Sequence, residues 1–70
     1  MKIKIGDMIH IPSGTYIFQY QDKIEIAPKK LEKLATPDSL LVVGENKEAY
    51  EILKDGVSWH VHKTDAYQLR

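Results

Sequence analysis

The segment GVSWHVHKTDAY, residues 56–67, decides the fold class. Apolar and polar side chains alternate along it, so that Trp59 and Val61 fall on one side and His60 and His62 on the other. Successive side chains of a β-strand point to opposite faces of its sheet. The alternation therefore predicts a strand with a buried tryptophan face and an open histidine face. The two histidines become the first candidates for a functional site.

The same period of two runs through most of the chain. Alternating or apolar runs, separated by turn sequences, occupy residues 8–11, 15–20, 24–26, 39–43 and 49–54. The Asp55-Gly56 step joins two of these runs, and Asp-Gly is a strong signal for a tight β-hairpin. We expect a single all-β domain over residues 1–70 with five or six strands that form a small, partly open barrel. The predicted core residues are Ile9, Ile11, Ile17, Val42, Ile52, Trp59 and Val61.

The segment PKKLEKLATP, residues 28–37, departs from this alternation. Pro28 suits the first position of a helix, and Leu31 and Leu34 are three residues apart, as on one helix face. Pro37 would end such a helix, because the residue before a proline disfavours the helical conformation. We therefore expect a short helix or an irregular loop near residues 28–36, and the sequence leaves both open.

The composition limits the classes of function. Ten basic residues balance ten acidic ones among the 70, which counts against a nucleic-acid partner. The absence of cysteine excludes disulfides and thiolate zinc sites. The first residues contain no continuous apolar stretch of the signal-peptide kind, and no segment has the length of a membrane span. We expect a cytoplasmic protein without a membrane partner. Because so short a chain has a small core, we also expect a homo-oligomer, a dimer or higher.

From Tyr50 onward the sequence orders a strand, an Asp-Gly hairpin, a second strand, the turn TDAY and a last strand QLR. This order resembles the second half of an SH3-like barrel, which has a distal hairpin, a one-turn 3₁₀ helix and a closing strand. The opening KIGDMIHIPSGTYIFQY is similar to the start of many SH3-like and KOW-type barrels. The signature motifs of signalling SH3 domains are absent, so the resemblance does not imply a proline-peptide groove.

The start KIKIGDMIHIPSGTY, in a cysteine-free chain of zero net charge, also resembles short early proteins of T-even-like bacteriophages. Several small families of that kind bind and sequester the cyclic nucleotide signals of host immunity. The resemblance implies a phage protein that acts in the cytoplasm of a bacterial host.

His60 and His62 have the spacing at which two histidines of one strand reach a common metal ion. A metal site needs a third or fourth ligand, for which His10 or Asp65 would have to come close. A catalytic histidine needs a nucleophile and an orienting acid, and only Ser58 shares the predicted face. We therefore predict no metal, no cofactor and no enzymatic activity.

The remaining candidates are aromatic and basic side chains. Tyrosines stack on nucleotide bases, a neutral imidazole offers one donor and one acceptor, and lysine is a mobile charge for phosphate. The turn Ser13-Gly14-Thr15 offers backbone N–H groups to an anion. The predicted ligand-binding residues are Tyr16, Tyr20, Lys29, Lys30, Lys33, His60 and His62.

These features favour a non-enzymatic protein that binds and sequesters a nucleotide second messenger, either a cyclic oligonucleotide or an ADP-ribose-type signal. The alternatives are a protein-interaction module that acts on a host or phage protein, and a KOW-like module associated with nucleic acid.

Overall fold

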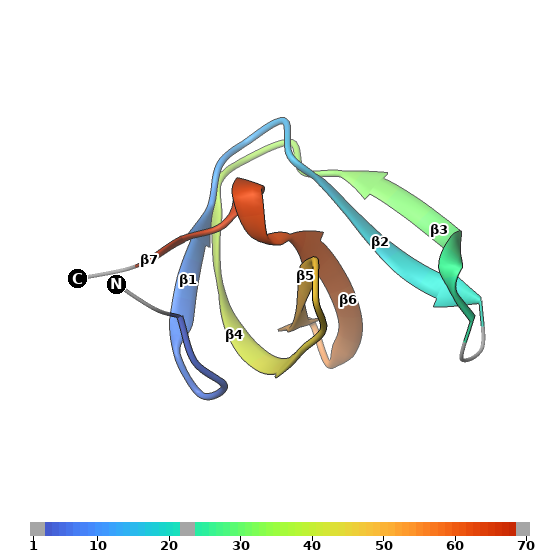
Figure 1. Cartoon of the computed structure of the whole chain (residues 1–70). Coiled ribbons are helices and arrows are strands. Elements are labelled where there is room, and N and C mark those ends of the chain that lie inside the picture. The colour runs from blue at the N-terminus through green and yellow to red at the C-terminus, as the bar shows by residue number, and fades with distance from the viewer. Residues whose placement is uncertain (1–2, 22–23, 69–70) are drawn as a thin grey trace.

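The computed structural model describes residues 3–21 and 24–68, and for residues 21 and 24–29 it describes the backbone alone. Seven strands form one antiparallel sheet in the order β3-β2-β6-β5-β4-β1-β7 (Figure 1). The strands are β1 (Met8–Ile11), β2 (Tyr16–Gln21), β3 (Ile24–Lys33), β4 (Asp38–Glu45), β5 (Ala49–Lys54), β6 (Val57–His62) and β7 (Tyr67–Gln68). A single 3₁₀ turn, η1 (Lys63–Asp65), joins β6 to β7. The all-β prediction is confirmed, and the described residues contain no α-helix.

One face of the sheet carries the hydrophobic core. The core side chains are between 0 and 8% exposed, and all seven residues predicted for the core are among them. Ile3, Leu34, Leu40 and Tyr50 complete this cluster. Strand alternation therefore identified the inward side chains of the central strands correctly.

The number of strands was underestimated. The sheet has seven strands rather than five or six, because β7 forms a separate short strand against β1 and because β3 extends to Lys33. β3 and β7 stand at the two ends of the strand order, so the sheet is not closed.

The turn between β5 and β6 has the predicted hairpin geometry. Asp55 has φ 52° and Gly56 has φ 78°, so both central residues adopt the positive φ that a type I′ turn requires. This turn fixes the register in which Glu51 lies opposite His60 and Ile52 lies opposite Trp59. The hairpin thus determines which side chains of β5 accompany the histidines.

The prediction of a helix or loop at residues 28–36 is wrong for residues 28–33, which belong to β3. Antiparallel pairing with β2 sets Leu31 opposite Phe18 and Lys33 opposite Tyr16. Pro28 lies opposite Tyr20, beside an irregularity in the ladder, and β3 is an edge strand that tolerates proline. The two leucines of the expected helix face separate, since Leu34 is buried and Leu31 is exposed. Strand pairing therefore outweighs the weak helical signals of this segment.

The hairpin of β2 and β3 extends away from the curled part of the sheet formed by β1, β4, β5 and β6 (Figure 1). The register between β2 and β6 contains one residue pair, Phe18 with His60. The backbone ladder between the hairpin and the rest of the sheet is thus short, so side chains at this junction have a large share in holding it.

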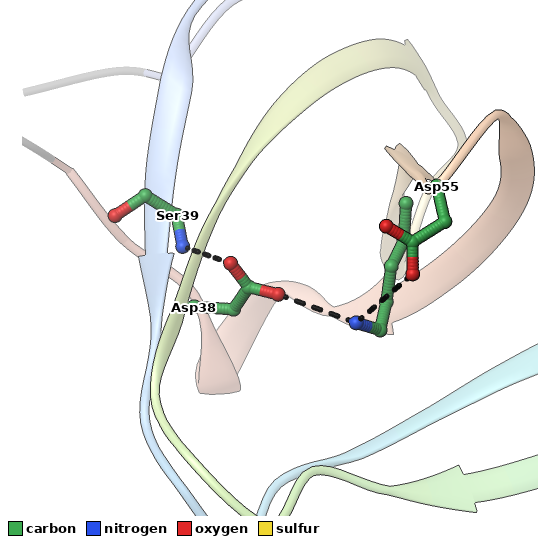
Figure 2. A network of polar contacts seen from close by, with 4 residues as sticks. Asp38, Ser39 and Asp55 are labelled. Atoms are coloured by element: carbon green, nitrogen blue, oxygen red, sulfur yellow. Dashed lines mark hydrogen bonds and ion pairs between the residues drawn. The ribbon is translucent and has the colours of Figure 1, made fainter.

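A polar network connects the start of β4 with the turn between β5 and β6. Asp38 accepts a hydrogen bond from the backbone N–H of Ser39 at 2.9 Å and forms an ion pair with Lys54 at 3.4 Å (Figure 2). The ammonium of Lys54 also lies 3.7 Å from the carboxylate of Asp55. These groups are partly or largely exposed, and such pairs contribute at most about 1 kcal/mol. The network therefore contributes little to the stability of the fold.

No helix within residues 3–21 and 24–68 is long and apolar enough to cross a membrane.

Candidate functional site

The histidines of β6 lie on the face opposite to the core, as predicted. Trp59 and Val61 are buried in the core, while His62 is exposed and His60 is partly exposed. The same alternation holds in β2, where Ile17 points into the core and Tyr16, Phe18 and Tyr20 share the other face. We call this second face of the sheet the outer face.

Pairing of Phe18 with His60 brings four rings together on the outer face. The ring centroid of Tyr20 is 4.6 Å from that of His60, and the centroid of Phe18 is 4.9 Å from that of His62. Phe18 also contacts Tyr20 edge to face at 5.3 Å and lies roughly parallel to His60 at 6.0 Å. We call these four residues, Phe18, Tyr20, His60 and His62, the ring cluster.

Phe18 is the most buried member of the ring cluster. Its side chain is only 6% exposed, although it lies outside the hydrophobic core on the other face of the sheet. Its neighbours in the cluster cover it, and the Nδ1 atom of His60 is shielded from solvent as well. The cluster is thus a packed aromatic surface rather than a set of separate side chains in water.

Tyr20 spans the junction between the hairpin and the curled part of the sheet. Its ring contacts His60 in β6, and its hydroxyl accepts a hydrogen bond of 3.5 Å from the side-chain amide of Asn46, which follows β4. Asn46 is itself held in place, because its side-chain oxygen accepts the backbone N–H groups of Glu48 and Ala49. The side chain of Tyr20 therefore has one contact at its ring and another at its hydroxyl.

Tyr16 and Lys33 border the ring cluster on the side of the hairpin. They are a cross-strand pair, and the ammonium of Lys33 lies 6.0 Å from the centroid of the Tyr16 ring. Both side chains are exposed, Tyr16 by 50%. Since Tyr16 and Phe18 share a face of β2, this border adds an accessible ring and a positive charge to the cluster.

The predicted lysine group is divided between the two faces. Lys30 lies on the core side, where its ammonium is 5.4 Å from the centroid of the Trp59 ring. Lys33 lies on the outer face, and the side chain of Lys29 falls outside the described residues. Alternation along a strand separates neighbouring lysines that a helix would have gathered.

Two residues absent from the prediction belong to the site: Glu51 lies beside His60, and Asn46 contacts Tyr20. Glu51 is the cross-strand neighbour of His60, and it accepts a hydrogen bond from the hydroxyl of Ser58. The carboxylate lies over Gly44, where an added Cβ would be 2.5 Å from its Oε1 atom. Hairpin register counted outward from Asp55-Gly56 would have placed Glu51 opposite His60. The contact of Asn46 with Tyr20 has no signal in the sequence, because it depends on where the β2–β3 hairpin lies relative to the segment that follows β4.

The geometry of the described residues supports neither a metal site at His60 and His62 nor an anion site in the turn Ser13-Gly14-Thr15. His10 is in β1, three strands away from β6, and the described residues contain no group of three side chains able to hold a metal ion. In the turn Ser13-Gly14-Thr15, the N–H of Gly14 bonds to the carbonyl of Leu34 and that of Thr15 bonds to the carbonyl of Pro12. Those two donors are used within the fold, so the suggestion that this turn holds an anion is wrong for them.

The candidate site is therefore the ring cluster with Tyr16, Lys33 and Glu51 around it, all on the outer face. Comparison with known proteins adds no precedent for it, since no family model, no curated protein and no solved structure matches this chain.

Proposed function

We propose that this protein is a non-enzymatic binding module that holds a nucleotide second messenger on the outer face of its sheet. The observation that carries the proposal is the ring cluster. Four aromatic and imidazole rings lie in contact on the outer face, opposite to the hydrophobic core. Stability alone would require apolar side chains on the core face only, so a packed aromatic surface on the other face favours a role in binding.

The chemistry of the cluster and its border suits a nucleotide. Stacking of a base on an aromatic side chain contributes about 1–3 kcal/mol, and Tyr20 and Tyr16 provide rings that are partly or half exposed. Lys33 supplies a cation for a phosphate next to those rings. The exposed imidazole of His62 adds a donor, and a second positive charge when it is protonated.

A binding role is supported by the partner of Ser58. Its hydroxyl donates to Glu51, which fixes that carboxylate on the outer face, as a group that contacts a bound ligand requires. We propose that the protein captures its ligand and withholds it from a receptor, as the resemblance to short phage proteins implies. An anti-defence role in a bacterial cytoplasm is part of this proposal.

We also propose that the sheet is an SH3-like barrel with an added hairpin. The order β7-β1-β4-β5-β6 within the sheet, and the 3₁₀ turn before β7, support this assignment. In this interpretation β2 and β3 form the long hairpin between the first two barrel strands, and the outer face at β6 is extended by that hairpin.

A second candidate function is docking to a protein. Met8, Leu41 and Leu53 are cross-strand neighbours on the outer face of β1, β4 and β5, and all three are exposed. This apolar row adjoins the candidate site only at Leu53, whose cross-strand neighbour is Ser58, and a protein partner would cover the whole row while a nucleotide would not. Amide hydrogen exchange with and without a candidate partner distinguishes the two surfaces.

Calorimetric titration with a panel of cyclic nucleotides and ADP-ribose tests the proposal. Wild-type protein should bind at least one member, and the double change His60→Ala, His62→Ala should weaken binding at least about tenfold, since it removes a charge-assisted contact and part of the stacking surface. His10→Ala is the matched control, because His10 lies three strands away, and it should leave affinity unchanged.

The pH dependence separates phosphate recognition from metal binding. A protonated imidazole is a cation, so affinity for a phosphate should rise as pH falls from about 7.5 to about 6. Glu51, in the neighbouring strand β5, lies directly opposite His60, whereas Lys33 lies on the outer face of β3, two strands away from β6. Binding through a metal ion would show the opposite trend, because protons compete with the metal. Affinity unchanged in the double variant would refute the proposed site.

A further inference from the structure

Glu51 gives the candidate site a property that stacking and phosphate recognition do not explain. A carboxylate beside a phosphate site weakens phosphate binding, so its position needs another reason. It lies in β5 directly across from His60, on the opposite side of that histidine from Phe18. Lys33, the cation of the site, is on the far strand β3. The candidate site thus has a basic end at β3 and an acidic end at β5, with aromatic rings between them.

The carboxylate of Glu51 is held in one place. Ser58, two residues before His60 in β6, donates its hydroxyl hydrogen to Oε2. On the other side the carboxylate lies over Gly44, the residue paired with Glu51 in β4, where a larger side chain would meet it. The group is partly exposed, so it combines a fixed position with access to a ligand.

The ring directly across from Glu51 is that of His60, and the ring of Tyr20 packs beside it. Its centroid is 4.6 Å from that of His60, and directly opposed side chains of neighbouring strands are about 5 Å apart at Cβ. A planar base stacked on Tyr20 beside His60 therefore brings its edge toward Glu51. The phosphate of the same nucleotide then extends toward His62 and Lys33.

We infer that the base read at this site is guanine, through its N1–H and its 2-amino group; this inference rests on the proposed nucleotide-binding function. A carboxylate has two acceptor oxygens and no donor when ionised. Guanine presents two adjacent donors on the edge that faces such a group. Hypoxanthine presents only the N1–H donor, and adenine presents one amino donor beside an acceptor nitrogen that the second oxygen repels. Guanine is thus the purine that satisfies both oxygens.

The experiment compares three nucleotides that differ only at this edge. GMP, IMP and AMP are titrated into the wild-type protein by calorimetry at one pH and one salt concentration. GMP should bind at least about tenfold more tightly than IMP or AMP, since each lacks a hydrogen bond to a charged acceptor. Equal affinities for the three would overturn the guanine inference and leave the nucleotide site itself standing. Binding of none of them, together with no binding across the wider panel, would overturn both.

The variant Glu51→Gln tests the same contact from the protein side. It keeps the size of the side chain and an oxygen for Ser58, but it replaces one acceptor by a donor. GMP affinity should fall about tenfold, and the preference for GMP over IMP should shrink to within about threefold. Glu32→Gln is the control, because it makes the same charge change on the other side of the sheet and should preserve the preference. Retention of the full GMP preference by Glu51→Gln would overturn the assignment.

Discussion

Replacement of Trp59 by alanine tests the assignment of the two faces of β6. Trp59 is 5% exposed and packs in the hydrophobic core, with the ammonium of Lys30 over its ring. A buried tryptophan removes about 150–250 Å² from water, which at about 25 cal/mol per Å² corresponds to about 4–6 kcal/mol. Alanine keeps a small part of this burial, so the expected loss of stability is about 3–5 kcal/mol.

A loss of this size exceeds or equals the whole stability of a domain this small, which rarely has more than about 3–5 kcal/mol. Trp59→Ala should therefore be largely unfolded at 25 °C without denaturant. Urea titration followed by far-UV circular dichroism is the suitable assay, because the variant has no tryptophan left for fluorescence.

Two further variants make this result specific. Trp59→Phe retains an aromatic ring in the core and should stay folded with a lower urea midpoint. Val57→Ala changes an exposed side chain of the same strand and should alter stability by no more than about 0.5 kcal/mol. A folded Trp59→Ala with a midpoint close to that of the wild type would refute the inward assignment, and with it the outer position of His60 and His62.

The remaining predictions concern the hairpin turn and the assembly. Gly56→Ala places a side chain at φ 78° and should cost about 1–2 kcal/mol, visible as a lower urea midpoint; an unchanged midpoint would argue against the type I′ turn. We further predict a homo-oligomer, most simply a two-fold dimer, whose second subunit helps to enclose a ligand on the outer face. Light scattering should report twice the chain mass of 8.1 kDa, and a monomer at every accessible concentration would contradict this prediction.

Local patterns were sufficient to predict the strands that contribute most to the core. Alternation placed Trp59 and Val61 inward and His60 and His62 outward, and the Asp-Gly step identified the hairpin between β5 and β6. These features depend on neighbouring residues and on the period of a strand, so the sequence contains them directly.

Pairing between distant segments was harder to predict. Residues 28–33 carry proline, leucines and lysines that suit a helix, and only the ladder with β2 makes them a strand. The mistake also affected the site, because a helix would have gathered lysines that β3 divides between its two faces. A single sequence contains no signal for that pairing.

The candidate site shows the same division between local and distant signals. Strand period put His60 and His62 on the outward face of their strand, but it did not indicate that β2 lies next to β6. Phe18 was not among the predicted site residues, and its burial beneath Tyr20 and the histidines follows from that pairing. Asn46 entered the site through a tertiary contact that no spacing predicts.

Amide chemical-shift mapping by NMR tests the central claim most directly. A ¹⁵N-labelled sample is titrated with GMP, or with the member of the nucleotide panel that binds best, and the shifted amides are assigned. The account predicts that the largest shifts gather at Tyr16–Tyr20 in β2 and at Ser58–His62 in β6, with Glu51 and Lys33 at the borders. Shifts that gather instead on β1 and β7, or that spread evenly over the sheet, would contradict a ligand site at the ring cluster.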